Sequence, residues 1–273
     1  MRVLGNDGTV TVSPTRCIGV LVLAVALSAC SSPEKPHANS GTTTSTSSPP
    51  PTGTTIAASG VRTVLSPVGL NIRAQPATTA TILRTAAQGA VLTVLAQSDQ
   101  GSGWFEVRGP TVTGWMSAAP NLSAPGIFAS YSSTQHQLAL LYPQGWTPSE
   151  SPPASVVFRP ASGADTVVVT TASTAGQLVR GRLGYHQTND EQVVVCGVTA
   201  DMVTFVAVGT TTTTTQPDGV VAERYLVQVH LTLDPQHALG IDANLADTTQ
   251  LQNYRDLVNS VTFPFPECQP AGA

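Results

Sequence analysis

The chain has 273 residues, of which 10% are charged, with 12 Lys and Arg against 16 Asp and Glu and a formal net charge of −4. A mildly acidic chain without a basic patch lacks what nucleic-acid binding requires, so we expect no nucleic-acid partner. The length allows one or two globular domains.

The first segment is typical of an export signal. Residues 18–27 ("IGVLVLAVAL") form a run of about ten apolar positions preceded by Arg16. A membrane-spanning helix needs roughly 20 such residues, so the run is too short to span and matches the apolar core of a signal peptide. We therefore expect residues 1–29 to be a removed leader.

The apolar run ends in the quartet Leu-Ser-Ala-Cys, at residues 27–30. This quartet resembles the bacterial lipobox, which implies that the thiol of Cys30 receives a diacylglycerol, with acyl chains such as palmitate, and that the chain is cut just before this residue. Two or three buried chains anchor a protein stably. The expected location is the cell membrane, lipid-anchored and facing the extracytoplasmic envelope. The alternative is an ordinary secretory signal with a chance cysteine.

Residues 30–61 contain the lipidated cysteine and then a segment rich in Ser, Thr, Pro and Gly. A segment of this composition, without an apolar period, cannot bury a core. We expect a flexible spacer with a root-mean-square reach of about 30 Å. Such a reach lifts the following domain off the lipid surface.

Residues 62–120 show short apolar alternations between turn signals, which indicate a small all-β barrel or sandwich. The pattern resembles the bacterial SH3 (SH3b) domain through four motifs, which are "LNIRAQP", "ILRTAAQGAVLTVL", "GWFEVR" and "TGWM". The resemblance implies a module that docks peptidoglycan peptides or other envelope ligands, or that mediates protein contacts. Gln75 departs from the family, which usually has glycine before this proline.

Four residues of this segment are candidates for ligand binding. Trp104 and Trp115 are large amphipathic groups near turns, and Asn71 and Arg73 alternate with apolar residues on one predicted strand. The alternative is structural, with both tryptophans packed under the barrel and the two polar residues holding the loop before Pro76.

Residues 128–266 are predicted to be an α+β domain. Short strands with turn signals, including "QPDG" at 216–219, precede a helical stripe of Leu251, Tyr254, Leu257, Val258 and Val261. Asp247 and Gln250 make a plausible capping box, "TAGQLVRGRLG" at 174–184 favours a short helix, and "TNDEQ" at 188–192 is expected to be a solvated loop. The overall expectation is mixed: a small SH3-like barrel, then a mainly antiparallel sheet with packed helices.

This second pattern resembles the PsbP/Mog1-like α/β sandwich of bacterial surface lipoproteins. The resemblance rests on "LLYPQGW", the long late hairpin and the final helix running into "VNSVTF". It implies a binding or assembly module without catalytic residues.

Two cysteines remain in the mature chain, Cys196 and Cys268. In an oxidising compartment such a pair favours a disulfide, and the alternative is two buried thiols. Neither lies near a histidine in the sequence, and the histidines lack metal-ligand spacing, so we expect no catalytic site, metal or cofactor.

The favoured function is a non-catalytic envelope binding module whose SH3b domain engages peptidoglycan or a partner protein. One alternative is a sensor or assembly protein whose C-terminal sandwich binds a small molecule or protein. A cell-wall hydrolase is the least favoured.

Overall fold

The structure is a computed structural model that describes residues 54–99, 103–151, 154–208 and 224–263. The following sequence predictions lie outside these residues: the leader, Cys30, most of the linker, the turn at 216–219 and Cys268.

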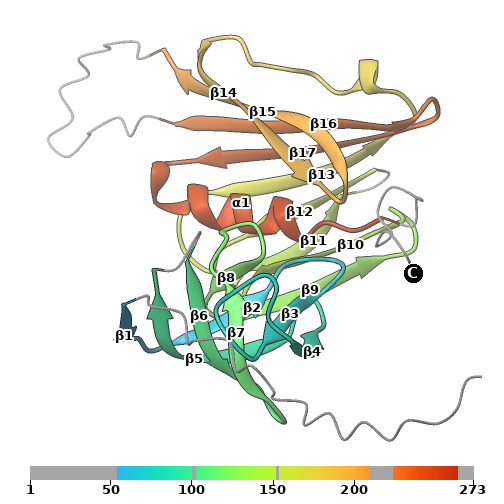
Figure 1. Ribbon diagram of the computed structural model, residues 1–273. Helices are drawn as coiled ribbons and strands as arrows, with labels where there is room; N and C mark the ends of the chain where they lie inside the picture. Colours follow the sequence, from blue (N-terminus) through green and yellow to red (C-terminus); the bar gives the residue numbers. More distant parts are fainter. Residues whose placement is uncertain (1–53, 100–102, 152–153, 209–223, 264–273) are drawn as a thin grey trace, which may run out of the picture. The chain divides into compact units, whose positions relative to one another are not determined.

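The first body is a sheet of eight short strands (Figure 1). Its strands run β4-β3-β7-β6-β5-β2-β8, and β1 pairs with β5. The strands are β1 (Thr55–Ala57), β2 (Val61–Val64), β3 (Leu70–Arg73), β4 (Ile82–Ala86), β5 (Val91–Ser98), β6 (Trp104–Arg108), β7 (Thr113–Ser117) and β8 (Ser123–Pro125). Each of these strands pairs with its neighbours in antiparallel orientation.

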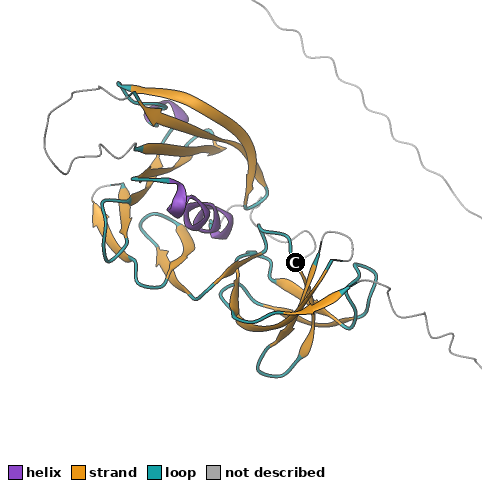
Figure 2. Ribbon diagram, turned by 90° about the vertical axis from the view of Figure 1, so that its left-hand side faces the viewer, coloured by secondary structure: helices purple, strands orange, loops and turns teal. Residues whose placement is uncertain are grey.

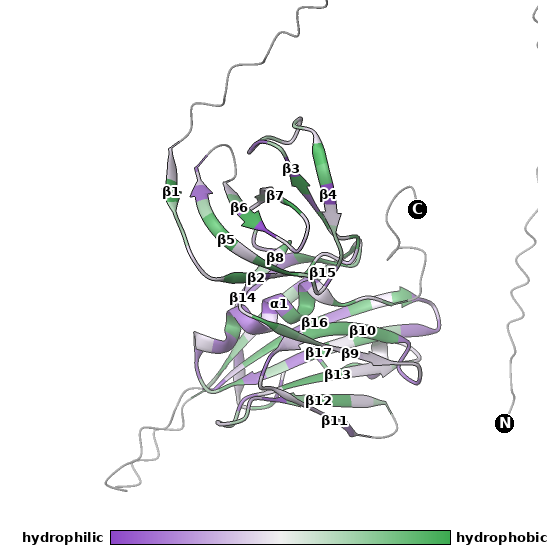
Figure 3. Cartoon of the chain, turned by 90° about the horizontal axis from the view of Figure 1, so that it is seen from below, coloured by the Kyte–Doolittle hydropathy of each residue, from purple (hydrophilic) through white to green (hydrophobic). Residues whose placement is uncertain are grey.

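The alternation of apolar and polar residues explains how this body forms its core. Along β3, Leu70 and Ile72 are buried, whereas Asn71 and Arg73 are only partly buried. Along β5 burial alternates in the same way, although most of its residues are apolar and the strand is largely green until its end in Figure 3. Because successive side chains of a strand point to opposite faces, each strand contributes one face to the core.

The second body combines a two-stranded and a seven-stranded antiparallel sheet with one α-helix (Figure 2). The larger sheet runs β11-β12-β13-β17-β16-β15-β14, and the smaller pairs β9 with β10. The elements are β9 (Phe128–Ser133), β10 (Leu138–Pro143), β11 (Thr147–Ser151), β12 (Ser155–Arg159), β13 (Thr166–Ala172), β14 (Tyr185–Val195), β15 (Val198–Ala207), β16 (Tyr225–Asp234), β17 (His237–Leu245) and α1 (Leu251–Ser260).

Helix α1 contacts β10, β14 and β17. The predicted apolar stripe faces this contact, since Tyr254, Leu257, Val258 and Val261 are each at most 1% exposed. The Tyr254 hydroxyl donates a hydrogen bond to the Ile241 carbonyl at 2.7 Å, which satisfies its polar atom inside the core. The helical period predicted from sequence is thus confirmed for the final helix.

The prediction of several packed helices is wrong for the described residues, which contain one α-helix. Residues 174–184 form only the 3-10 turn η1 (Ala175–Gln177) and a loop. Buried Gln228 binds this loop, accepting from Gly181 N at 2.7 Å and donating to Val179 O at 3.1 Å. Gly181 also has φ 74°, which a helix does not allow. Tertiary contacts therefore replace the helical hydrogen bonds.

Two further local predictions are corrected. Asp247 caps the 3-10 turn η2 (Thr248–Gln250) by accepting from Thr249 N at 2.7 Å, so it does not form a capping box with Gln250. The stretch 188–192 belongs to the long strand β14, where Glu191 forms an ion pair with Arg255 of α1 at 2.6 Å. Pairing with β15 along almost the whole strand outweighs the turn-like composition.

Both bodies belong to one compact unit of the chain. Leu65 and Ala124 share a buried apolar cluster with Phe128 and Leu141. The Gln88 side chain donates to Leu65 O at 2.8 Å and to Ser260 O at 2.7 Å. The first body therefore contacts the second through apolar packing and through a polar contact to the end of α1.

Candidate functional site

Strand pairing brings three of the four predicted binding residues onto one face of the first body. Arg73 is opposite Ile82 on one side and Trp115 on the other, and Trp115 is opposite Glu106. Residues directly opposite each other in antiparallel strands share a face. Ile82, Arg73, Trp115 and Glu106 thus form a continuous row across four strands, which we call the barrel row.

Asn71 lies two residues before Arg73 and so on the same face of β3. Its side-chain oxygen accepts from the Thr85 hydroxyl at 2.7 Å. Arg73 donates to the Ala80 carbonyl at 2.7 Å. Both residues therefore hold the β3–β4 hairpin, while each remains partly exposed.

Trp104 differs from the other three candidates because it is only 5% exposed. It is opposite Ser117 at the start of β6. Its burial favours the packing alternative over ligand contact, although its assignment as a binding residue stays a prediction.

Sequence reasoning did not identify two members of the barrel row, Ile82 and Glu106. Ile82 is 48% exposed, and its neighbour Leu83 and several other apolar strand residues of this chain are similarly exposed, so exposure alone does not single it out. Its place beside Arg73 depends on a register shift between Ile72 and Arg73, a feature that spacing alone does not reveal.

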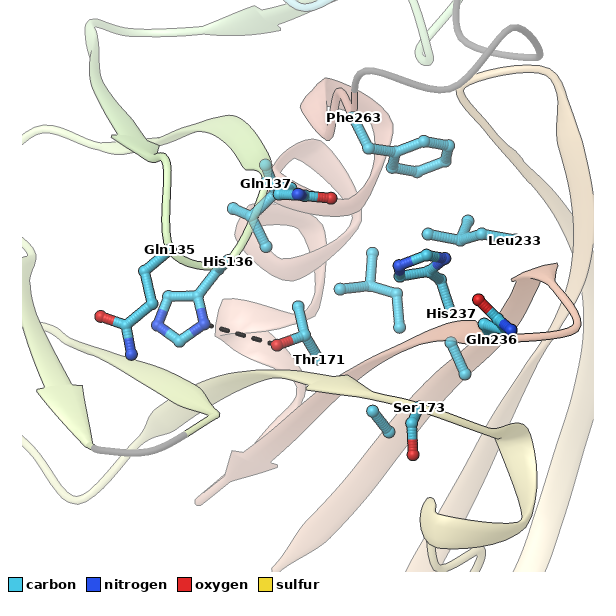
Figure 4. Close-up of a pocket in the computed structure, with 13 residues that line it drawn as sticks. Gln135, His136, Gln137, Thr171, Ser173, Leu233, Gln236, His237 and Phe263 are labelled. Atoms are coloured by element: carbon cyan, nitrogen blue, oxygen red, sulfur yellow. Dashed lines mark hydrogen bonds between the residues drawn. The ribbon is translucent and has the colours of Figure 1, made fainter.

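The second body contains a cavity of about 360 Å³, which we call the sandwich cavity (Figure 4). It is bounded by the β9–β10 turn, the end of β13, the β16–β17 hairpin and Phe263 after α1. In Figure 4, Gln137 and Thr171 lie on one side, and Leu233, His237 and Phe263 lie on the other. The volume is within the range of small-molecule sites.

A hydrogen-bonded chain fixes one wall of this cavity. His136 is buried, and its Nε2 lies 2.8 Å from Glu150 Oε2, while its Nδ1 lies 3.4 Å from the Thr171 hydroxyl. The Tyr131 hydroxyl donates to the other Glu150 oxygen.

The Tyr131 and His136 hydrogen bonds lower the pKa of Glu150. Partial burial, and next the bond to Glu150, raise the pKa of Tyr131. At neutral pH the chain therefore consists of an ionised carboxylate accepting from a neutral phenol and an imidazole.

The polar face of β16 is covered by the 174–184 loop. His230 lies 3.0 Å from Asp242 on β17, and Gln228 beside it binds the loop backbone. His237, which is seven residues later, is bonded to a different carboxylate, Asp234, at 2.7 Å. The two histidines are thus separate structural groups.

The part of the chain that the structure describes holds no group of three or more His, Cys, Asp or Glu able to bind a metal. It also holds no helix with the length and apolar character needed to cross a bilayer.

Comparison with known families shows that residues 68–121 match the bacterial SH3 domain. The predicted SH3b domain is therefore confirmed, and the barrel row lies within the matched segment. The search of curated proteins returned no match.

Two solved structures are similar to part of this chain. One is the solution structure of cyanobacterial PsbP (CyanoP) from Synechocystis sp. PCC 6803, at 17% identity and a TM-score of 0.35, covering 50% of this chain and 92% of that one. The other is a crystal structure from Bacteroides thetaiotaomicron VPI-5482, at 11% identity and the same TM-score. It covers 50% of this chain, which spans about half of that protein (48%).

A PsbP structure is thus among the structural neighbours, as the sequence resemblance implied. With TM-scores of 0.35, neither likeness carries a functional argument.

Proposed function

We propose that this protein is a lipid-anchored envelope lipoprotein that acts as a non-catalytic binding module. Its bacterial SH3 domain engages peptidoglycan or an envelope partner protein. The observation that carries the proposal is the SH3 match over residues 68–121, which follows a lipobox-like cysteine and a Ser/Thr/Pro-rich spacer. This order supports the proposal of a binding domain carried at the end of a membrane tether.

The barrel row supplies the chemistry for this contact. Trp115 offers an aromatic face for apolar or peptide groups, and Arg73 offers a guanidinium for carboxylates. Ile82 adds apolar area beside them. Wall peptides combine these features, since they carry carboxylates on short aliphatic residues.

Sedimentation with purified peptidoglycan tests the proposal. The lipid-free chain, residues 31–273, is expected to sediment with the wall, and Trp115→Ala is expected to reduce binding at least about fivefold. Leu183→Ala is the matched control, because this fully exposed side chain lies in the second body. If neither the wild type nor the control sediments, the wall is not the ligand and a protein partner must be sought.

The anchor is tested separately in cells. Wild type is expected to incorporate labelled palmitate and fractionate with membranes, whereas Cys30→Ala is expected to do neither. Membrane fractionation of Cys30→Ala together with an unlabelled wild type would refute the lipoprotein proposal.

A second candidate function is small-molecule binding by the second body. The observation that favours it is the sandwich cavity, with a polar wall fixed by His136 and Glu150. A third candidate, a cell-wall hydrolase, predicts clearing in a zymogram, and we expect none.

A further inference from the structure

The lining of the sandwich cavity favours an uncharged ligand. None of the 13 described residues that line it is Asp, Glu, Lys or Arg. Its two imidazoles are already paired with carboxylates, His136 with Glu150 and His237 with Asp234, and neither carboxylate lines the cavity. A charged ligand would therefore lose its hydration without gaining a new counter-ion.

The polar lining groups are of the kind that both donate and accept hydrogen bonds. They include the Gln137 amide and the hydroxyls of Thr171 and Ser173, which donate to Ala154 O at 3.4 Å and to Gln177 Oε1 at 3.0 Å and so offer a ligand chiefly their acceptor lone pairs. In Figure 4 the Gln137 amide points toward the cavity. Such groups are complementary to ligand hydroxyls and to an acetamido group, which itself has one N–H donor and one carbonyl acceptor.

The opposite side of the cavity is apolar. Leu233 and Phe263 lie there, and Phe263 is 6% exposed. The partly exposed Leu233, backed by the largely buried ring of Phe263 and facing amides and hydroxyls, suits a ligand with one C–H face and a polar rim, which is the surface of a sugar ring.

The polar wall is preorganised. Thr171 lies beside buried His136, whose other nitrogen is held by Glu150. Gln137 follows His136 in the β9–β10 turn with φ 51°, a left-handed backbone conformation that is uncommon for a residue other than glycine. A wall fixed before binding reduces the entropy lost when a ligand is held.

We propose that the sandwich cavity binds an uncharged N-acetylated hexosamine, in a volume with room for about one or two sugar rings. The inference rests on the second candidate function, in which the second body is itself a binding module. It is independent of whether the barrel row binds peptidoglycan.

The test is a titration of the lipid-free chain followed by amide NMR spectra, with N,N′-diacetylchitobiose as the probe. We expect saturable shifts at Gln137, Thr171 and the β16–β17 hairpin. Cellobiose, which lacks the acetamido groups, and chitobiose with free ammonium groups are each expected to bind at least about tenfold more weakly.

Thr171→Val removes one hydroxyl at nearly constant volume and is expected to weaken binding about three- to tenfold. Thr232→Val is the matched control, because Thr232 is exposed on β16 and does not line the cavity. The melting temperature of each variant shows whether it is folded.

Absence of saturable shifts in the folded wild type would overturn the inference, and so would equal affinity for cellobiose or the ammonium disaccharide. Shifts confined to residues 68–121 would also overturn it, while supporting a sugar site on the SH3 domain. Trp115→Ala, which tests the barrel row, is expected to leave the cavity shifts unchanged, so failure of the two proposals can be told apart.

Discussion

Replacing Asp256 by Asn should stabilise the protein at neutral pH. Asp256 lies on α1 with 1% of its surface exposed, and Gln252 donates to its carboxylate at 2.8 Å. Burial raises its pKa from 3.8 to about 6, although Gln252 and the charge of Arg62 on β2 act in the opposite direction. An ionised carboxylate at this site is therefore a cost that an amide of the same shape avoids.

The size of the expected stabilisation follows from the pKa shift of Asp256. The difference between 3.8 and about 6 is equivalent to about 3 kcal/mol, and partial solvent screening reduces the expected gain to about 1 to 3 kcal/mol. Because the folded chain holds the Asp256 proton more tightly than the unfolded chain, wild type loses stability as pH rises from about 4 to about 6. The variant should be equal to wild type below this window and more stable above it.

Urea unfolding at pH values from 4 to 8 measures the difference directly. Asp247→Asn is the control, because the stability contributed by Asp247 should depend on pH in the opposite direction. Hydrogen bonds from the Thr249 side chain and backbone lower the pKa of Asp247, so its contribution is present at neutral pH and lost on acidification. An Asp256→Asn variant that is less stable than wild type at pH 7.5, or a difference that does not change with pH, would refute the reasoning.

Gly114→Ala should destabilise the first body by about 1 to 3 kcal/mol, because a Cβ there would lie 2.6 Å from a backbone carbonyl of β3. Thermal unfolding checks this, with Gly176→Ala as the control, since its nearest neighbour would be at 4.0 Å. Tyr254→Phe should cost about 1 kcal/mol by removing the buried hydrogen bond to the Ile241 carbonyl, as measured by urea unfolding, and an unchanged stability would contradict this contribution. Mass spectrometry of unreduced peptides should find Cys196 linked to Cys268, and separate alkylated peptides would disprove the link.

Several features of the fold were predictable because they follow a fixed local period. The alternation in β3 and the helical stripe of α1 each repeat with the geometry of one element. The SH3 motifs belong to the same group, since turn residues and strand lengths recur along a short segment. Tyr254 could be assigned to the core from its spacing alone.

The candidate sites were less predictable because their residues come from distant parts of the chain. Trp104 and Trp115 have similar sequence surroundings, yet one is 5% exposed and the other half-buried beside Arg73. Gln228 of β16 binds the loop that was expected to be a helix, although 47 residues of sequence separate it from Gly181.

Neighbouring residues are enough to recognise the leader-like run, the lipobox-like cysteine, the spacer composition, the SH3 domain and the faces of individual strands. Long-range packing, in contrast, sets the barrel row, the sandwich cavity, the burial of Asp256 and the loop that replaces the expected second helix. The cavity joins residues as far apart as Gln135 and Phe263. Contacts at such separations depend on strand register and packing, which local periodicity does not specify.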